Sequence, residues 1–284
     1  MHLFCCIFLH IAKIVIKHIK VAYSFCMEFI YFVLLGIVQG LTEFLPVSSS
    51  GHLILLERIF KIDVGNFMLV SILLHVATLI SVIILYRKEV FLLIKKPFST
   101  LGINIILSTF VTVIVVLIFK SFFVESFDGR FLPICFMLTA IILYLTYLKT
   151  KSKNFKSYTK VNKKTALIVG LVQGLAVLPG ISRSGSTISV GTFCDIDSDT
   201  ATKYSFLLSI PIIFCSLVFE IFECVMQKQQ LFVGNIFYLV LSFCLALVFG
   251  IIAIKLMKKL AKTGKYYYFS AYLVIICIIS LFFC

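Results

Sequence analysis

Charged residues are scarce in this sequence. Asp, Glu, Lys and Arg make up only 13% of the 284 residues, whereas hydrophobic residues make up 61%, and the mean hydropathy is +1.13. Soluble domains carry roughly 25% charged residues, so this composition excludes a soluble globular protein. It predicts an integral membrane protein with a single membrane-embedded domain, residues 27–284.

Acidic residues are the scarcer of the two charged classes. The chain has 12 Asp and Glu against 26 Lys and Arg, which gives a net charge of +14. In a soluble protein such an excess would suggest binding to nucleic acid. Here most of the basic residues lie in short clusters between apolar segments, where the cytoplasmic loops of membrane proteins collect them. We therefore expect no nucleic-acid partner.

Two further signals are absent. The ten cysteines form no CxxC pair, so we expect neither disulfides nor a Cys-bound metal. Residues 1–26 lack a small-residue cleavage site, and their lysines follow the apolar run "LFCCIFL" instead of preceding it, which argues against a signal peptide. Either translation begins at Met27, or this N-terminal extension is a dispensable interfacial helix with a basic face.

Long apolar runs fill most of the remaining chain. A helix that crosses the hydrocarbon core needs about 20 residues, and six segments approach or reach that length. Three strongly basic stretches, 87–96, 149–164 and 255–265, separate some of them. The positive-inside rule places these stretches in the cytoplasm and the C-terminus outside. The six expected spans are residues 66–86, 101–119, 131–148, 204–222, 235–254 and 266–283.

This topology leaves two segments that cannot cross the membrane. Residues 29–60 must enter and leave from the outer side, and residues 165–190 must do so from the cytoplasmic side. Both segments are interrupted halfway by Pro and Gly, which suits broken helices. We therefore expect two re-entrant helix pairs.

The two re-entrant segments resemble each other in sequence. "GIVQGL" at Gly36 recurs as "GLVQGL" at Gly170, and "SSSG" at Ser48 recurs as "SRSG" at Ser182, both at an offset of 134 residues. Such a duplication entering from opposite faces is an inverted-topology repeat, whose tips meet near the membrane midplane. The predicted fold is therefore an all-α polytopic membrane protein with about six transmembrane helices plus the two re-entrant pairs. Its repeats cover about residues 29–148 and 165–283.

The first predicted tip carries a carboxylate and three hydroxyls. Gln39 and Glu43 share one helix face because they are four residues apart. Pro46 ends that helix, and Ser48 to Ser50 begin the next one, which leaves backbone N–H groups unpaired at the break. Such a helix start attracts anions.

The second tip, "PGISRSGST", repeats this device and adds Arg183. Two helix starts, a guanidinium and a row of hydroxyls favour a tetrahedral oxyanion, either phosphate or pyrophosphate. Beside such a site, Glu43 is best explained by a divalent cation that bridges to phosphate oxygens, or by an acid/base role. A purely structural pair with Arg183 is the alternative, but an ionisable group at membrane depth costs at least about 2.5 kcal/mol and is functional by default.

Two histidines lie within the apolar part of the chain. His52 follows the three serines within one helical turn, which favours a role at the site over a buried core histidine. His75 lies in the middle of an expected span without a local partner. Structural and functional interpretations of His75 are equally supported by the sequence.

These residues resemble the membrane undecaprenyl-diphosphate phosphatases of the bacitracin-resistance type. That family is marked by a Glu-or-Gln, three residues, Glu pattern and by PGxSRSxxT, which here are "QGLTE" from Gln39 to Glu43 and "PGISRSGST" from Pro179 to Thr187. The resemblance extends through "EFLPVSSSGH" and the hydropathy profile from about residue 28 to the end. Many relatives have a second Glu where this chain has Gln39.

The resemblance implies hydrolysis of undecaprenyl diphosphate in the bacterial inner membrane, dependent on Mg²⁺ or Ca²⁺. It implies that Ser49 is the nucleophile, that Glu43 is the main metal and acid/base carboxylate, and that His52 transfers a proton or orients phosphate. Arg183 would bind the diphosphate, and Gln39 is an expected substrate-binding residue and a candidate second metal ligand. The other expected substrate-binding residues are Ser48, Ser50, Ser182, Ser184 and Thr187. The expected partner is a prenyl diphosphate lipid, and a homodimer is a candidate assembly.

Three alternatives remain open. The attacking group is either Ser49, through a phosphoseryl intermediate, or a metal-activated water. A secondary transporter or flippase of a phosphorylated lipid is the main rival function, because inverted repeats with broken helices are a transporter architecture. A second rival is the lipid phosphatase superfamily that shares an "SGH" signature, but no His follows His75, so the downstream half of its motif is missing.

Overall fold

The computed structural model describes residues 25–62, 64, 67–153, 155–227 and 235–284. The predicted N-terminal extension, residues 1–26, lies outside the described residues except for its last two. The described chain is all helical and contains no strand, only an isolated bridge between Tyr158 and Ile196. The predicted fold class, an all-α polytopic membrane protein, is confirmed.

The first described helix is Phe25–Phe44, followed by α2 (Ser49–Phe60), α3 (Phe67–Leu85), α4 (Arg87–Lys95), α5 (Thr100–Ile118), α6 (Lys120–Ser126), α7 (Leu132–Lys151), α8 (Lys163–Leu175), α9 (Arg183–Phe193), α10 (Ser198–Gln227), α11 (Ile236–Thr263) and α12 (Tyr267–Ser280).

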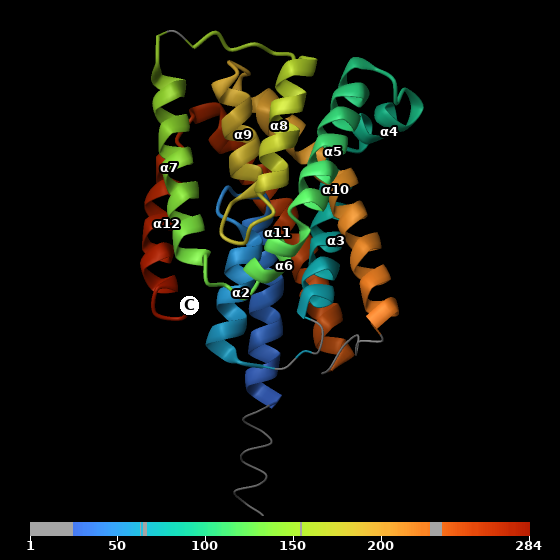
Figure 1. Cartoon of the computed structure of the whole chain (residues 1–284), viewed down its shortest axis with the longest axis vertical. Coiled ribbons are helices and arrows are strands. Elements are labelled where there is room, and N and C mark those ends of the chain that lie inside the picture. The colour runs from blue at the N-terminus through green and yellow to red at the C-terminus, as the bar shows by residue number, and fades with distance from the viewer. Residues whose placement is uncertain (1–24, 63, 65–66, 154, 228–234) are drawn as a thin grey trace, which may run out of the picture.

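The six predicted spans correspond to α3, α5, α7, α10, α11 and α12, which run roughly parallel along the long axis of the molecule (Figure 1). Among the described residues, five helices are long and apolar enough to cross a membrane alone, or six if α3 and α4, bent by 87°, count as one span. Two differences from the prediction follow from helix length. The last helix, α12, has only 14 residues, whereas Phe25–Phe44 has 20 and is long enough to cross by itself.

The three basic stretches meet at one end of the molecule. At this end Lys203 at the start of α10 pairs with Glu89 of α4 at 2.7 Å, and Lys258 of α11 lies over the ring of Tyr86 at 4.0 Å. Lys149 of α7 contributes a further ion pair. The positive-inside rule therefore places all three stretches on the same side of the membrane.

Two helical hairpins enter the bundle from opposite ends. Phe25–Phe44 rises from the lower end in Figure 1 and α2 returns there, while α8 descends from the upper end and α9 returns to it. Tyr31 and Phe60, near the open end of the first hairpin, have ring centroids 5.5 Å apart. The tips of the hairpins contact each other in the middle, where the Gly180 N–H donates to Ser48 Oγ at 3.1 Å.

Each hairpin packs through glycines against a different long helix. A Cβ on Gly36 would meet the Ser242 carbonyl oxygen at 2.4 Å, and a Cβ on Gly170 would meet that of Ser108 at 2.5 Å. Only glycine permits such close backbone approach between helices. The two glycines are 134 residues apart, and so are the two serines, which is the offset that relates the two motifs. The inverted repeat therefore includes α5 and α11 as equivalent helices.

Candidate active site

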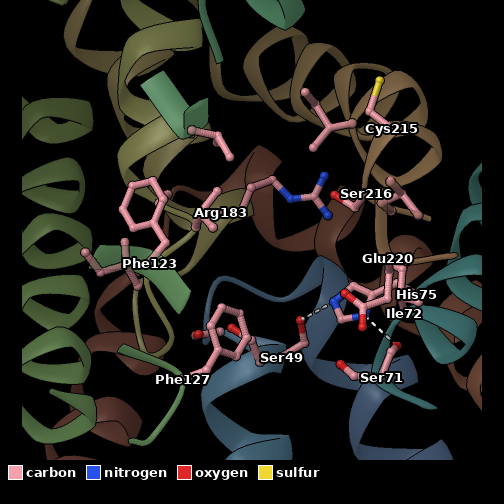
Figure 2. A pocket seen from close by; sticks show the side chains of 18 of the residues that line it. Ser49, Ser71, Ile72, His75, Phe123, Phe127, Arg183, Cys215, Ser216 and Glu220 are labelled. Atoms are coloured by element: carbon pink, nitrogen blue, oxygen red, sulfur yellow. Dashed lines mark hydrogen bonds between the residues drawn. The ribbon is translucent and has the colours of Figure 1, made fainter. Parts of the chain in front are cut away.

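A cavity of ~430 Å³ lies where the two tips meet. Its polar end is formed by the tips and by α3, and its apolar walls come from α5, α6 and α10. Figure 2 shows Arg183 reaching into this cavity from α9, with Ser49 and His75 on the opposite wall. Both predicted tips therefore line the same cavity and form one site.

Glu43, at the end of the first helix, is the centre of the polar network. Its side chain is buried, with 2% exposure, and its Oε2 accepts hydrogen bonds from Ser49 Oγ at 2.6 Å and from Gln39 Nε2 at 3.0 Å. His75 Nε2 lies 3.1 Å from the same oxygen. Both Glu43 oxygens are occupied, because Arg183 Nη2 forms an ion pair with Oε1.

Arg183 crosses from the second tip to the first. It is the first residue of α9, after the N-cap Ser182, whose side chain accepts from the Gly185 N–H at 3.0 Å. While Nη2 pairs with Glu43, Nη1 is buried without a hydrogen-bond partner. A buried donor without a partner is costly, and in this cavity it is placed to bind an anionic ligand.

The predicted serines all line the cavity, and two of them also cap helices. Ser48 caps α2 through the Gly51 N–H at 3.4 Å, as Ser182 caps α9. Ser49 and Ser50 line the cavity. Ser184 also lines it, but its hydroxyl donates to the Leu45 carbonyl at 3.2 Å and so joins the two tips.

The structure adds His75 to the site, which the sequence left undecided. His75 Nδ1 lies 2.8 Å from the Ser71 carbonyl oxygen, and Nε2 lies 3.5 Å from Ser49 Oγ. A carbonyl oxygen only accepts, so Nδ1 donates and Nε2 faces Ser49 and Glu43. The only signal in the sequence was an ionisable residue at membrane depth.

Three predicted site residues do not line the cavity: Gln39, His52 and Thr187. Thr187 bonds within α9 and contacts Ser205 Oγ of α10 at 2.6 Å, so it joins two helices. His52 contacts the Ser48 carbonyl and Tyr272 of α12. The predicted roles of Thr187 in substrate binding and of His52 in proton transfer stay predictions.

The predicted cation site rests on Glu43 and Gln39. Among the residues described, no group of three or more His, Cys, Asp and Glu side chains is placed to hold a metal ion. Gln39 turns its amide nitrogen to Glu43, and its Oε1 is buried without a partner. A half-turn of this amide would place the unpartnered oxygen beside Glu43. Two oxygen ligands, completed by phosphate oxygens and water, suit Mg²⁺ or Ca²⁺.

Comparison with known proteins gives a consistent assignment. Residues 32–279 match the family described as "Bacitracin resistance protein BacA". Similar proteins include an "Undecaprenyl-diphosphatase" of Carboxydothermus hydrogenoformans, 41% identical over 240 residues, which are 84% of this chain and 91% of the relative. Proteins with the same name from Treponema denticola and Methanococcus vannielii are 39% and 38% identical, over 85% and 84% of this chain and 92% and 94% of the relatives. With its predicted motifs gathered in one cavity and this similarity along most of its length, the chain belongs to the bacitracin resistance protein BacA family.

Proposed function

We propose that this protein hydrolyses undecaprenyl diphosphate to undecaprenyl phosphate and inorganic phosphate. It thereby recycles the lipid carrier for peptidoglycan and other cell-wall polymers and confers resistance to bacitracin. The observation that carries the proposal is the 2.6 Å hydrogen bond from Ser49 to Glu43 in a cavity that Arg183 enters from the opposite tip. The names of the relatives supply the substrate class.

The geometry suits attack by Ser49 on the terminal phosphorus. Arg183 binds the diphosphate through Nη1 and stabilises the charge that develops on the transferring phosphoryl group. As the bond from Ser49 Oγ to phosphorus forms, the hydroxyl proton passes to Glu43 Oε2, which already accepts the hydrogen bond from Ser49. The bond to the bridging oxygen breaks and undecaprenyl phosphate leaves. Water then releases inorganic phosphate and restores the serine.

Direct attack by water on the same phosphorus would use the same residues. In that case Ser49 orients the water and Glu43 accepts its proton. A divalent cation held by Glu43 and Gln39, which we propose to be Mg²⁺ or Ca²⁺, would neutralise phosphate charge. Oε1 of Glu43 is available to such a cation only after Arg183 Nη2 moves from it towards the phosphate, because the two form an ion pair without substrate.

The apolar walls of the cavity suit a lipid tail. Val113, Val116, Ile213 and Phe219, from α5 and α10, continue the cavity from the polar tips towards the end that carries Lys120. A prenyl chain can therefore remain among apolar side chains while its diphosphate reaches Ser49. We propose that the enzyme lies in the bacterial inner membrane with its basic end in the cytoplasm. A homodimer stays a prediction.

The test uses purified protein, undecaprenyl diphosphate and measured phosphate release. Wild type should turn over with Mg²⁺ and lose activity with chelator, whereas Ser49→Ala, Glu43→Gln and Arg183→Lys should lose activity by orders of magnitude while still binding lipid. Ser209→Ala is a matched control, because Ser209 is a buried serine that bonds only within α10. Unchanged turnover in the three site variants would contradict the site assignment.

The same experiment separates the enzyme from the transporter hypothesis. The inverted repeat, whose tips meet in the middle of the bundle, would also suit a secondary transporter of a phosphorylated lipid. A transporter should retain lipid movement across vesicles of Ser49→Ala, with weakened affinity only. Phosphate release that depends on Ser49 favours the enzyme.

A further inference from the structure

Both ring nitrogens of His52 are engaged outside the cavity. Nδ1 lies 2.7 Å from the Ser48 carbonyl oxygen, and Nε2 lies 2.8 Å from the Tyr272 hydroxyl. The carbonyl oxygen can only accept, so Nδ1 carries the hydrogen, and Nε2 of the neutral ring accepts from Tyr272. Neither nitrogen is left to take a proton from Ser49.

Aromatic packing fixes this orientation of the imidazole. The ring of Tyr272 is stacked on it at 4°, with centroids 5.7 Å apart, and Phe136 of α7 packs edge-on at 5.3 Å. His52 is only 7% exposed. A rotation that turned Nε2 towards Ser49 would break both hydrogen bonds and the stack.

The residue that His52 holds has an unusual backbone. Ser48 has a φ of 70°, although it is not glycine, whereas Ser182 at the equivalent place in the second tip has a φ of −75°. Such a conformation persists only when its surroundings over-determine it. Here the carbonyl of Ser48 accepts from His52 and its hydroxyl accepts from the Gly180 N–H. The next residue is Ser49, so the backbone conformation of Ser48 sets the direction in which the proposed nucleophile points towards Glu43.

We infer that His52 and Tyr272 are positioning residues. Tyr272 holds the ring of His52 through Nε2, and His52 holds the strained backbone of Ser48 so that Ser49 faces Glu43. Neither residue touches the reacting atoms. The inference rests on the proposed function for its effect on turnover, but the arrangement itself can be measured without substrate.

The substrate-free test is ¹⁵N NMR of histidine rings in detergent micelles. The triple variant His2→Gln, His10→Gln, His18→Gln leaves only His52 and His75 of the five histidines, and His52→Asn in that background assigns the signals. His52 should be protonated at Nδ1, and Tyr272→Phe should shift its Nε2 resonance. Tyr268→Phe, on the same helix, should not. Protonation at Nε2, or an Nε2 resonance insensitive to Tyr272→Phe, would overturn the inference.

The kinetic test compares two replacements of His52. Asn keeps an N–H at the position of Nδ1, so His52→Asn should lower kcat only about three- to tenfold, as expected for weakening one hydrogen-bonded network. His52→Ala should lower it at least tenfold further, and KM should change little in both. If the two variants are equally inactive, by about 10²- to 10⁴-fold, His52 is a general acid or base and the inference fails.

The two tests separate this inference from the proposed function. A wild-type protein that releases no phosphate contradicts the proposed function, and the ¹⁵N spectrum then decides the inference alone. A wild-type protein that is active, with Asn and Ala variants of His52 equally inactive, contradicts the inference alone.

Discussion

The two hairpins share a scaffold but not a chemistry. At equivalent positions, Gly36 and Gly170 each approach the backbone of a serine, and Ser48 and Ser182 each cap a helix. The reactive residues differ, because Glu43 of the first hairpin corresponds to Val177 of the second. The positions that place backbone against backbone thus agree between the repeats, as do Gln39 and Gln173.

The difference in charge between the tips has a physical basis. In the proposed function the ligand lies between both helix starts, and a carboxylate beside a phosphate needs a positive charge nearby to offset their repulsion. The first tip holds that carboxylate, and the second tip holds the guanidinium that neutralises it, since Arg183 occupies the position equivalent to Ser49. Two similar hairpins thereby form one asymmetric site.

The largest expected effect comes from the position where the hairpins differ most. Glu43→Gln should lower phosphate release by about 10²- to 10⁴-fold, because it removes the base that Ser49 contacts. Val177→Ala, a substitution at the equivalent position of the second hairpin, should lower phosphate release less than tenfold. Similar losses in both variants, measured at equal amounts of folded protein, would contradict the division of roles.

A second comparison uses the paired glutamines. Gln39 donates to Glu43 and its equivalent Gln173 donates to Thr112 Oγ1, both at 3.0 Å. Hydrogen bonds to a charged group are worth about 1.5–3 kcal/mol and neutral ones about 0.5–1.5. Gln39→Leu should therefore reduce kcat at least tenfold, whereas Gln173→Leu should lower the unfolding temperature and leave kcat within twofold of wild type.

Gln39→Glu tests the cation site from the other direction. A second carboxylate beside Glu43 should lower the Mg²⁺ concentration needed for half-maximal activity, because divalent cations bind more tightly as ligand charge increases. Titration of phosphate release with Mg²⁺ measures this. An unchanged or raised requirement would contradict Gln39 as a ligand position.

The shared scaffold should respond equally in the two hairpins. An added Cβ would lie 2.4 Å from a Ser242 oxygen in Gly36→Ala and 2.5 Å from a Ser108 oxygen in Gly170→Ala. Overpacking of this kind costs about 1–3 kcal/mol. Both variants should lower the unfolding temperature by a similar amount, and Gly191→Ala, whose nearest contact would be 3.0 Å, should lower it less. A large difference between the first two would contradict equivalent packing.

The sequence predicted the hairpins but only part of the site. Hydropathy and basic clusters locate the spans, and the repeated motifs locate the tips, because these are local patterns. The contacts of His75 with Glu43 and of His52 with Tyr272 join residues 32 and 220 positions apart. No local pattern encodes such contacts, so the sequence favoured His52 for the site and left His75 open, whereas the structure places His75 in the cavity. The sequence also could not show that Thr187 faces Ser205.

The smallest expected effect concerns the outer ends of the hairpins. Lys61 and Asp195 occupy equivalent positions, and both have a positive φ, 54° and 61°. A left-handed conformation costs a non-glycine residue roughly 1–2 kcal/mol, which glycine avoids at an entropic cost of about 0.5–1 kcal/mol. Lys61→Gly should therefore raise the unfolding temperature slightly. Asp195→Gly should raise it less, because Asp tolerates this conformation better and its ion pair with Lys149, at 2.7 Å, is lost.

The pH dependence of the unfolding temperatures of Lys61→Gly and Asp195→Gly separates the effect of backbone conformation from the effect of the lost ion pair. The hydrogen bond from Lys149 holds the pKa of Asp195 below its usual range. A carboxylate whose pKa is lowered on folding stabilises the protein above its unfolded pKa, and that stabilisation is lost as pH falls through the folded value. Below about pH 4, the advantage of Lys61→Gly over Asp195→Gly should therefore shrink. A difference between the variants that is constant with pH would assign it to backbone conformation alone.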